Sequence, residues 1–206
     1  MPAHFTESSY EESFIELFEG MDYRYVYGPE LERDYMNPLY VEDFEDSIYR
    51  INKGKDREAI KDAIYRITHI ENGSLEKKNQ VFTNYLQNGV DVSYFKDGKE
   101  KSDIVYLIDY ENVSNNSFVV ANQWTFIEHS NKRPDVILFI NGMPLVLVEL
   151  KSPSREETDV SEAYTQLRNY MLEIPSMFIY NQICVMSDQL TSKAGTITSG
   201  EDRYME

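Results

Sequence analysis

Three charged residues stand at the ends of two apolar runs in the segment RPDVILFINGMPLVLVELK, residues 133–151. Asp135 precedes the first run, and the second run ends in Glu149-Leu150-Lys151. Both runs have the length and composition of buried strands. Because side chains alternate along a strand, Glu149 and Lys151 would project from the same face. Acidic oxygens and an ammonium at one end of a sheet can bind a hard divalent cation and act on a phosphate ester, so this segment is the main candidate for chemistry.

Whether Asp135 faces Glu149 depends on the register of the hairpin between the two runs. A two-residue loop, Asn141-Gly142, would pair Asp135 with Val148, whose side chain lies on the opposite face of the sheet. A three-residue loop, Asn141–Met143, would pair Asp135 with Glu149, and its glycine would occupy the left-handed position that such a bulged turn requires. A bulge beside Asp135 would give the same alignment. We expect one of these last two arrangements.

Two facing carboxylates would repel each other unless a divalent cation lay between them. Hard oxygen ligands with open water positions suit Mg²⁺ better than Zn²⁺. Lys151 would then orient or help to deprotonate the attacking water and stabilise developing charge, which predicts hydrolysis of a phosphodiester. The alternative is structural, because strand ends meet water and a Glu-x-Lys pair is usually a solvated salt bridge. The combination of all three residues around a short turn favours the catalytic interpretation.

The N-terminal part of the chain has helical periodicity up to about residue 87. A first helix would follow Thr6 as its N-cap, and three more are expected over Val41–Ile51, Asp56–Ile70 and Ser74–Leu86. After Gly89 the period changes to two, which predicts strands at Val90–Phe95, Asp103–Tyr110 and Ser117–Glu128 ahead of the two strands described above.

A last helix would begin after the cap Thr158-Asp159 and end before Pro175, followed by strands at Met177–Tyr180 and Ile183–Ser187. These elements predict an α/β fold with a mixed, largely antiparallel sheet flanked by helices. We divide the chain into a helical N-terminal portion packed on the core (1–88), the core itself (89–190), and a tail of turn and loop composition that leads toward a further domain (191–206).

The charge balance limits the kinds of partner. Twenty basic and 36 acidic residues give a net charge of −16, which argues against a protein that coats nucleic acid through bulk charge. An acidic inhibitor that mimics DNA stays open, although it would leave Pro134-Asp135 and Glu149-Leu150-Lys151 without a purpose. Cys184 lies in an apolar run, so we expect a buried structural thiol in a reducing compartment. The acidic N-terminus without an apolar signal core, and the lack of a membrane-spanning stretch, predict a soluble, intracellular protein.

The motifs resemble those of the PD-(D/E)xK nucleases. Pro134-Asp135 and Glu149-Leu150-Lys151 match the name-giving pattern, and Gln166 and Tyr170 match the QxxxY motif of one branch. Longer runs, including NKRPDVILFINGMPLVLVELKSP and AYTQLRNY, are similar to the N-terminal nuclease domain of the restriction (motor) subunit of type I restriction enzymes. The resemblance covers most of the chain and is weakest before about Asn79.

This resemblance implies a restriction-endonuclease-like core and a role for each matching residue. Asp135 and Glu149 would be the metal-binding acids, with the carbonyl of Leu150 as a further ligand, and Lys151 would be the catalytic lysine. Gln166 and Tyr170 would position DNA or the catalytic groups, although Tyr170 also lies on the apolar face of its helix.

The resemblance also implies Mg²⁺-dependent cleavage of double-stranded DNA in the prokaryotic cytoplasm, in a complex with modification (methyltransferase) and specificity subunits. The sequence has no G-x-x-x-x-G-K-[ST] motif, so the ATP that drives translocation in the family would bind a motor domain C-terminal to this one. A stand-alone PD-(D/E)xK repair or resolvase nuclease is the alternative within enzymes.

Other charged residues near the motifs are open to two interpretations. Lys132-Arg133, Arg155 and Arg168 flank the proposed site and could neutralise phosphates, although scattered basic residues are more often ordinary surface. Glu11 or Glu12 could supply the further acid that some relatives use, but the solvated face of a helix is the favoured interpretation.

Overall fold

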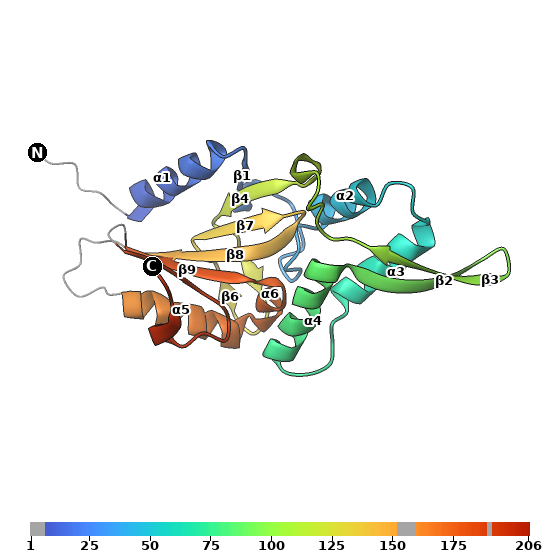
Figure 1. Cartoon of the computed structure of the whole chain (residues 1–206). Coiled ribbons are helices and arrows are strands. Elements are labelled where there is room, and N and C mark those ends of the chain that lie inside the picture. The colour runs from blue at the N-terminus through green and yellow to red at the C-terminus, as the bar shows by residue number, and fades with distance from the viewer. Residues whose placement is uncertain (1–6, 152–159, 189–190) are drawn as a thin grey trace, which may run out of the picture.

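The structure of the chain is a computed structural model, and it describes residues 7–151, 160–188 and 191–206 (Figure 1). At its centre lies a six-stranded sheet, which contains, in spatial order, β1 (Arg24–Tyr27), β4 (Phe118–Asn122), β7 (Val136–Ile140), β8 (Met143–Leu150), β9 (Ile183–Ser187) and β10 (Ser192–Gly195). β1 is parallel to β4 and β9 is parallel to β8, whereas the other neighbours are antiparallel. The predicted α/β fold with a mixed, largely antiparallel sheet is confirmed.

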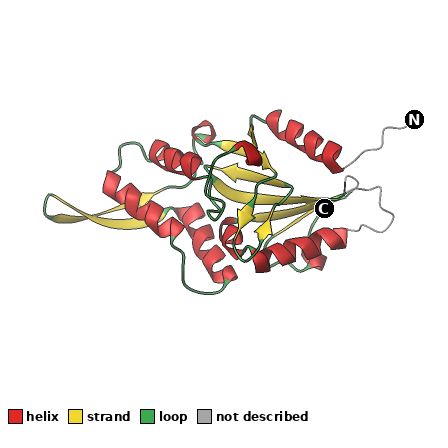
Figure 2. Cartoon of the chain, turned by 180° about the vertical axis from the view of Figure 1, so that it is seen from behind, coloured by secondary structure: helices red, strands yellow, loops and turns green. Residues whose placement is uncertain are grey.

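Helices cover both faces of this sheet, as Figures 1 and 2 show from opposite sides. α1 (Glu7–Glu19) lies on one face, where Ile15 belongs to a core with alternate residues of β7 and β8, among them Val136, Leu138, Val148 and Leu150. α5 (Val160–Glu173) lies on the other face. It shares a core with the intervening residues of β7 and β8, including Ile137, Phe139 and Leu147. The central strands are therefore buried on both sides, which explains their continuous apolar runs.

The N-terminal helices form a second unit beside the sheet. It contains α2 (Val41–Ile51), α3 (Arg57–Thr68), α4 (Leu75–Asn88) and a hairpin of β2 (Val90–Lys96) and β3 (Lys99–Val105). Asp56 and Ser74 cap α3 and α4 through their side chains, so these helices begin where the sequence predicted. The hairpin extends beyond the rest of the molecule (Figures 1 and 2). No helix in the described ranges is both long and apolar enough to cross a membrane.

Short elements connect these parts. β5 (Phe126–Ile127) pairs with β6 (Asn131–Lys132) in a separate two-stranded ribbon. Single turns of 3-10 helix occur at Gly28–Glu30, Val113–Asn115 and Glu201–Arg203. The predicted strand Ser117–Glu128 is divided into β4 and β5 because the chain turns at Gln123, whose φ of 53° is left-handed.

The prediction of a strand at Met177–Tyr180 is wrong. This run lies in a short helix, α6 (Pro175–Tyr180), which begins with a proline in its first turn. Met177, Phe178 and Tyr180 are buried, and the Tyr180 ring meets that of Phe82 on α4 edge-on at 5.0 Å between centroids. A short apolar run suits a buried helix as well as a strand, and here packing against α4 decides.

Three other departures concern where strands begin and end. The strand predicted at Asp103–Tyr110 runs instead over Lys99–Val105, because Asp97-Gly98 forms a tight turn with left-handed φ at both residues. β1 lies in the portion that we expected to be helical, and β10 lies in the tail that we expected to be loop. The proposed caps Thr6 and Thr158-Asp159 lie outside the described residues.

The register of the β7–β8 hairpin arises from neither of the two arrangements that we expected. Ile140 pairs with Met143, so the loop has two residues, and both Asn141 (φ 50°) and Gly142 (φ 71°) are left-handed. The expected three-residue loop is therefore wrong. A bulge in mid-strand, where Leu145 is left without a partner, shifts the register so that Val136 pairs with Val148. The Leu145 carbonyl instead accepts a hydrogen bond of 2.7 Å from the Gln182 N–H.

We expect Gly142→Ala to destabilise the fold by about 3 kcal/mol. A Cβ at this position would lie 2.4 Å from the Phe44 nitrogen and 2.5 Å from the Tyr40 carbonyl oxygen, so backbone would have to move. Gly98→Ala is the matched control, because its φ is also left-handed but no atom lies within 4 Å of the added carbon. Gly98→Ala should cost only about 1 kcal/mol. Equal losses in urea unfolding experiments would contradict the close approach of Gly142 to α2.

Candidate active site

The bulge brings Asp135 and Glu149 together where β7 begins and β8 ends. Val136 pairs with Val148, so Asp135, which precedes Val136, stands opposite Glu149, which follows Val148. The Asp135 Oδ2 atom accepts a hydrogen bond of 2.8 Å from the Leu150 backbone N–H. Side chains alternate along each strand, so both acids lie on the face that α5 covers. The alignment that the sequence suggested is thus present in the structure.

Glu149 is buried and only partly satisfied. Its Oε1 atom accepts a hydrogen bond of 2.8 Å from Lys151 Nζ, whereas its Oε2 atom has no hydrogen-bond partner among the described residues. The pKa of Glu149 is raised to about 8, first by burial and then by the negative charge of Asp135, while Lys151 opposes both effects. This carboxyl is therefore protonated at neutral pH unless a cation offsets its charge.

Lys151 connects the acids to α5. Its Nζ atom donates a hydrogen bond of 2.8 Å to Glu149 Oε1 and another of 2.8 Å to Gln166 Oε1. Gln166 Nε2 in turn donates to the Tyr170 hydroxyl at 2.7 Å, one helical turn further along. The side chain of Lys151 keeps 15% of its surface exposed, so its ammonium can be reached from solvent.

Tyr170 lies in the core and also contacts a residue of the candidate site. It is 5% exposed and belongs to the core beneath α5, and its hydroxyl also ends the chain of hydrogen bonds from Lys151. Burial raises the pKa of Tyr170, and the charge of Glu149 adds to this shift, so the hydroxyl stays protonated. It can therefore hold the Gln166 amide in a fixed orientation.

A cleft of about 790 Å³ lies between α1 and the sheet beside Asp135. Glu11 and Glu12 line it together with Asp135 and Arg133. Glu11 accepts a hydrogen bond of 2.5 Å from Asn122 Nδ2. The expectation of a solvated helix face thus holds for Glu12, which is exposed, whereas Glu11 is half-buried and bonded to β4.

Sequence reasoning missed several residues that support the site. Asn122 and Gln123 end β4 and bind Glu11 through their side-chain amides, and Tyr25 on β1 donates to Asn122 Oδ1 at 2.9 Å. The Ser187 carbonyl at the end of β9 accepts a hydrogen bond of 2.8 Å from the Lys151 N–H. Their positions depend on strand pairing across the sheet, which no local pattern encodes.

A second cleft, of about 560 Å³, lies on the α5 side, and Gln166, Tyr170 and Lys132 line it. Lys132 forms an ion pair with Glu173 and is thus already neutralised. Arg168 points away from the site, because it donates to the Ile197 carbonyl at 3.0 Å. Arg155 lies outside the described residues.

Cys184 is buried beneath α5, and its burial was expected. Burial raises the pKa of its thiol to about 12, so it stays protonated and unreactive at neutral pH.

The oxygen atoms at this site fit a hard divalent cation. Two carboxylates that face each other, one with an unsatisfied buried oxygen, are stabilised by a positive ion between them. The described residues contain no group of three or more His, Cys, Asp or Glu side chains that could hold a metal. Water or substrate oxygens would therefore complete the shell, an arrangement that Mg²⁺ favours.

Comparison with known proteins agrees with the motifs gathered here. Residues 4–203 match the family described as "Type I restriction enzyme R protein N terminus". The chain belongs to this family. The match includes both strands that carry the acids, the helix that carries Gln166, and the N-terminal helices, so the family extends well beyond the short motifs.

Members of the type I restriction enzyme group are similar along nearly the whole chain. The type I restriction enzyme HindI endonuclease subunit of Haemophilus influenzae is 30% identical over 96% of this chain and 20% of its own length. A putative type I restriction enzyme MjaIXP endonuclease subunit of Methanocaldococcus jannaschii is 33% identical over 94% of this chain and 20% of its own length. The chain thus spans about a fifth of the length of these two relatives.

Proposed function

We propose that this chain is the nuclease domain of a type I restriction enzyme and that it hydrolyses phosphodiester bonds of double-stranded DNA with Mg²⁺. In the complete enzyme, cleavage would be coupled to ATP-dependent translocation and would involve modification (methyltransferase) and specificity subunits. The names of the relatives, which are endonuclease subunits, support this proposal. The observation that carries it is the position of Asp135, just before the Val136–Val148 pair, where its charge acts on Glu149 beside Lys151 at one end of the sheet.

Each residue of the site would have its own task. Asp135, Glu149 and the Leu150 carbonyl would hold Mg²⁺, which polarises a phosphate oxygen when bound. Lys151 Nζ has three N–H bonds and uses two of them for Glu149 and Gln166, so one is left for the attacking water or the phosphate. Its positive charge would stabilise the charge that develops on the phosphate oxygens in the transition state.

Gln166 and Tyr170 would act by positioning. Gln166 holds Lys151 through its amide oxygen, and Tyr170 holds Gln166 through its hydroxyl, so the ammonium keeps one direction relative to Glu149. Such support restricts the motion of a catalytic group without contacting the reacting atoms.

Asp135→Asn tests the proposal. The substitution removes a negative charge but keeps an oxygen that can accept the Leu150 N–H, so we expect the fold to be retained. Mn²⁺ binding, measured by calorimetry, should be lost because only Glu149 would remain as an anionic ligand. DNA cleavage by the enzyme reconstituted with its other subunits should also be lost.

Asp91→Asn is the matched control, because Asp91 is an exposed carboxylate at the base of the β2–β3 hairpin. This variant should bind Mn²⁺ and cleave DNA like the wild type. The metal assignment fails if Asp135→Asn binds Mn²⁺ as tightly as the wild-type chain does.

A further inference from the structure

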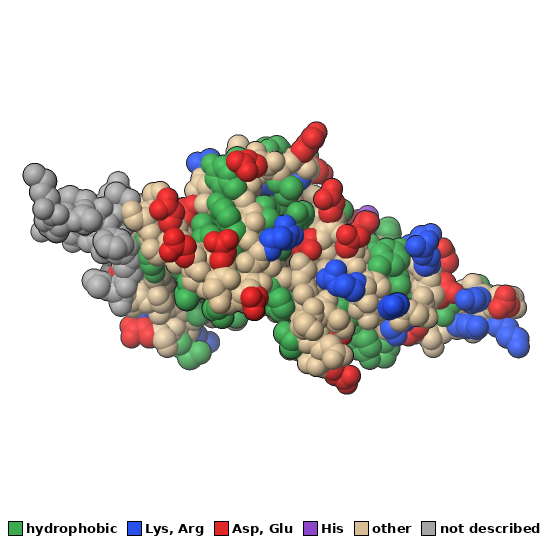
Figure 3. Space-filling model, turned by 90° about the horizontal axis from the view of Figure 1, so that it is seen from above, with side chains coloured by type: hydrophobic (Ala, Val, Ile, Leu, Met, Phe, Trp, Pro, Cys, Tyr) green, Lys and Arg blue, Asp and Glu red, His purple; other side chains and the backbone are tan. Residues whose placement is uncertain are grey.

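The hairpin of β2 and β3 belongs to a part of the chain with an unusual charge. Residues 50–105, which contain α3, α4 and this hairpin, hold 11 of the 20 basic residues but only 9 of the 36 acidic ones. The net charge of −16 therefore comes from the remainder of the chain. Figure 3 shows Lys and Arg side chains gathered at the hairpin end, with Asp and Glu more frequent over the rest of the visible face.

Three lysines share one face of the hairpin. Lys96 stands directly opposite Lys99, and opposed residues project from the same face. Lys101 lies two residues along β3 from Lys99 and therefore projects from that face as well. We call Lys96, Lys99 and Lys101 the lysine face. Towards the base of the hairpin the same side carries Val90 and Val105, which are buried in the core of the helical unit.

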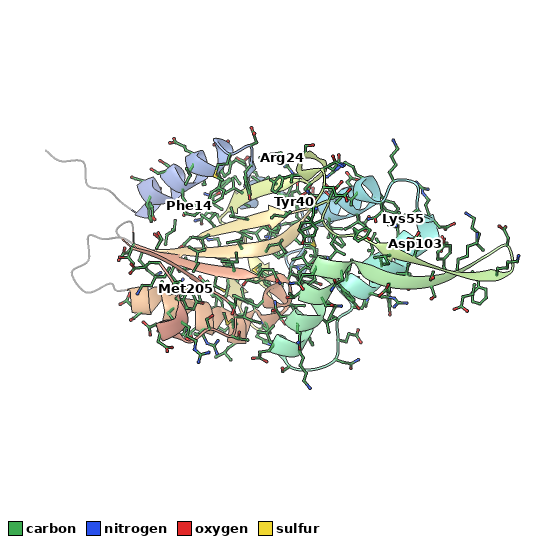
Figure 4. The ribbon with its side chains drawn as sticks, viewed as in Figure 1. Phe14, Arg24, Tyr40, Lys55, Asp103 and Met205 are labelled. Atoms are coloured by element: carbon green, nitrogen blue, oxygen red, sulfur yellow. The ribbon has the colours of Figure 1, made fainter. Side chains whose placement is uncertain are left out.

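Two ion pairs fix the hairpin against the start of α3. Lys55 Nζ lies 2.7 Å from Asp103 Oδ1, and Figure 4 shows these two side chains pointing toward one another. Lys96 Nζ lies 2.6 Å from Asp56 Oδ2, the same carboxylate that caps α3. The lysine face is thus held in one orientation rather than at the end of a freely moving arm.

The other two lysines form no close ion pair with a described residue. Lys99 and Lys101 are exposed, and within the described ranges neither has an acidic oxygen within 4.0 Å. Lys96, which stands opposite Lys99, is already offset by Asp56, and Lys101 stands opposite Tyr94. Lys99 and Lys101 therefore present two exposed ammonium groups at the end of a projecting ribbon, where phosphate anions can bind them.

We infer that the lysine face binds the phosphate backbone of duplex DNA. A two-stranded β-ribbon fits the major groove, and lysines on it can pair with phosphates at the groove's edge. The choice of duplex DNA rests on the proposed function. The hairpin lies at the opposite end of the molecule from the end of β8 that carries Glu149 (Figure 1), so it would hold DNA at a distance from the scissile phosphate.

An acidic protein surface is the alternative partner. Protein interfaces have an apolar centre, and the exposed large apolar residues of this ribbon, Phe95 and Ile104, project from the face opposite the lysines. The lysine face itself is polar apart from the half-buried Tyr94, as expected for contacts with phosphates. The observations therefore favour DNA.

The test compares two double variants of the 206-residue chain. Both are made in an Asp135→Asn background, so that DNA is not cut during the measurement. Binding of a fluorescein-labelled duplex oligonucleotide is followed by anisotropy over a salt series that begins at low ionic strength. Lys99→Gln/Lys101→Gln should weaken binding by about tenfold and reduce the slope of log K against log salt by about 2.

Lys77→Gln/Lys78→Gln is the matched control, because it removes the same charge from α4. It should leave the affinity and the slope almost unchanged. Equal losses in both double variants, or no binding by the Asp135→Asn chain even at low salt, would overturn the inference. So would intact DNA binding by Lys99→Gln/Lys101→Gln together with weaker assembly of the reconstituted enzyme, which would assign the lysines to a protein partner.

The inference and the proposed function can fail separately. Anisotropy detects binding without cleavage, so a role for the lysine face is measurable even if the site at Asp135 has no nuclease activity. Conversely, loss of cleavage in Asp135→Asn with no effect of Lys99→Gln/Lys101→Gln on DNA binding would retain the nuclease and reject the lysine face.

Discussion

Replacing Lys151 by alanine is expected to slow DNA cleavage by the reconstituted enzyme by about a hundredfold or more, because the proposed function assigns to this lysine the charge that stabilises the transition state. Mn²⁺ binding should persist, since Asp135, Glu149 and the Leu150 carbonyl are unchanged. Binding is best measured at about pH 9, above the pKa of Glu149, which is about 8 in the wild type. Loss of Lys151 raises that pKa further, because the lysine opposes the effect of burial.

Gln166→Ala tests the positioning of the Lys151 ammonium, whereas Lys151→Ala removes its charge. Gln166 donates to Tyr170 and accepts from Lys151, and its loss leaves the lysine charged but less constrained. We therefore expect a loss of about tenfold, smaller than that for Lys151→Ala. Both variants should hydrolyse ATP and translocate normally if the motor is a separate domain. Unchanged cleavage by Lys151→Ala, in an enzyme that still translocates, would make Lys151 an ordinary strand-end lysine.

Glu149→Gln is expected to make the metal-free chain more stable than the wild type at high pH but not at low pH. The folded-state pKa of about 8 lies above the ordinary value of 4.5, so the folded chain binds this proton more tightly than the unfolded chain does. Between these two values the free energy of unfolding falls as pH rises, by up to about 1.4 kcal/mol per pH unit. Glutamine resembles the protonated acid at every pH and removes this dependence.

The experiment is urea unfolding between about pH 5 and pH 8 with a chelator present. Near pH 5 the variant and the wild type should have similar stability, and near pH 8 the variant should be more stable by on the order of 3 kcal/mol. Glu45→Gln changes an exposed carboxylate on α2 in the same way, and its stability should equal that of the wild type at both pH values. Parallel stability curves for Glu149→Gln and the wild type would show that Glu149 is ionised without a metal.

Local rules predicted the parts of the site that lie within one element. Glu149 and Lys151 share a face because strands alternate, and Gln166 and Tyr170 meet because they lie one turn apart on α5. The helices α2, α3 and α4 lie within two residues of their predicted ends because caps and periodicity are local as well.

Features that depend on distant contacts were not predictable in this way. The bulge at Leu145 is held by Gln182, and the tight loop at Gly142 packs on α2, about 100 residues earlier in the chain. Glu11 could be placed on a helix, but the side of that helix that faces Asp135 is set by packing on the sheet. The run Met177–Tyr180 became helix for the same kind of reason.

The bulge at Leu145 also limits how this hairpin can change in evolution. A paired addition of two residues to each strand lengthens β7 and β8 and keeps Asp135 and Glu149 opposite each other on the face that α5 covers. A single insertion or deletion that shifts the pairing of the two strands by one residue, with no further bulge to absorb it, would move Glu149 to the other side of the sheet, away from Gln166 on α5. The number of residues between the loop and each acid can thus change by even steps in both strands together, and the total length of the hairpin matters less. A chain in which Leu145 was paired in the ladder instead of bulged would keep this alignment only with a loop one residue longer.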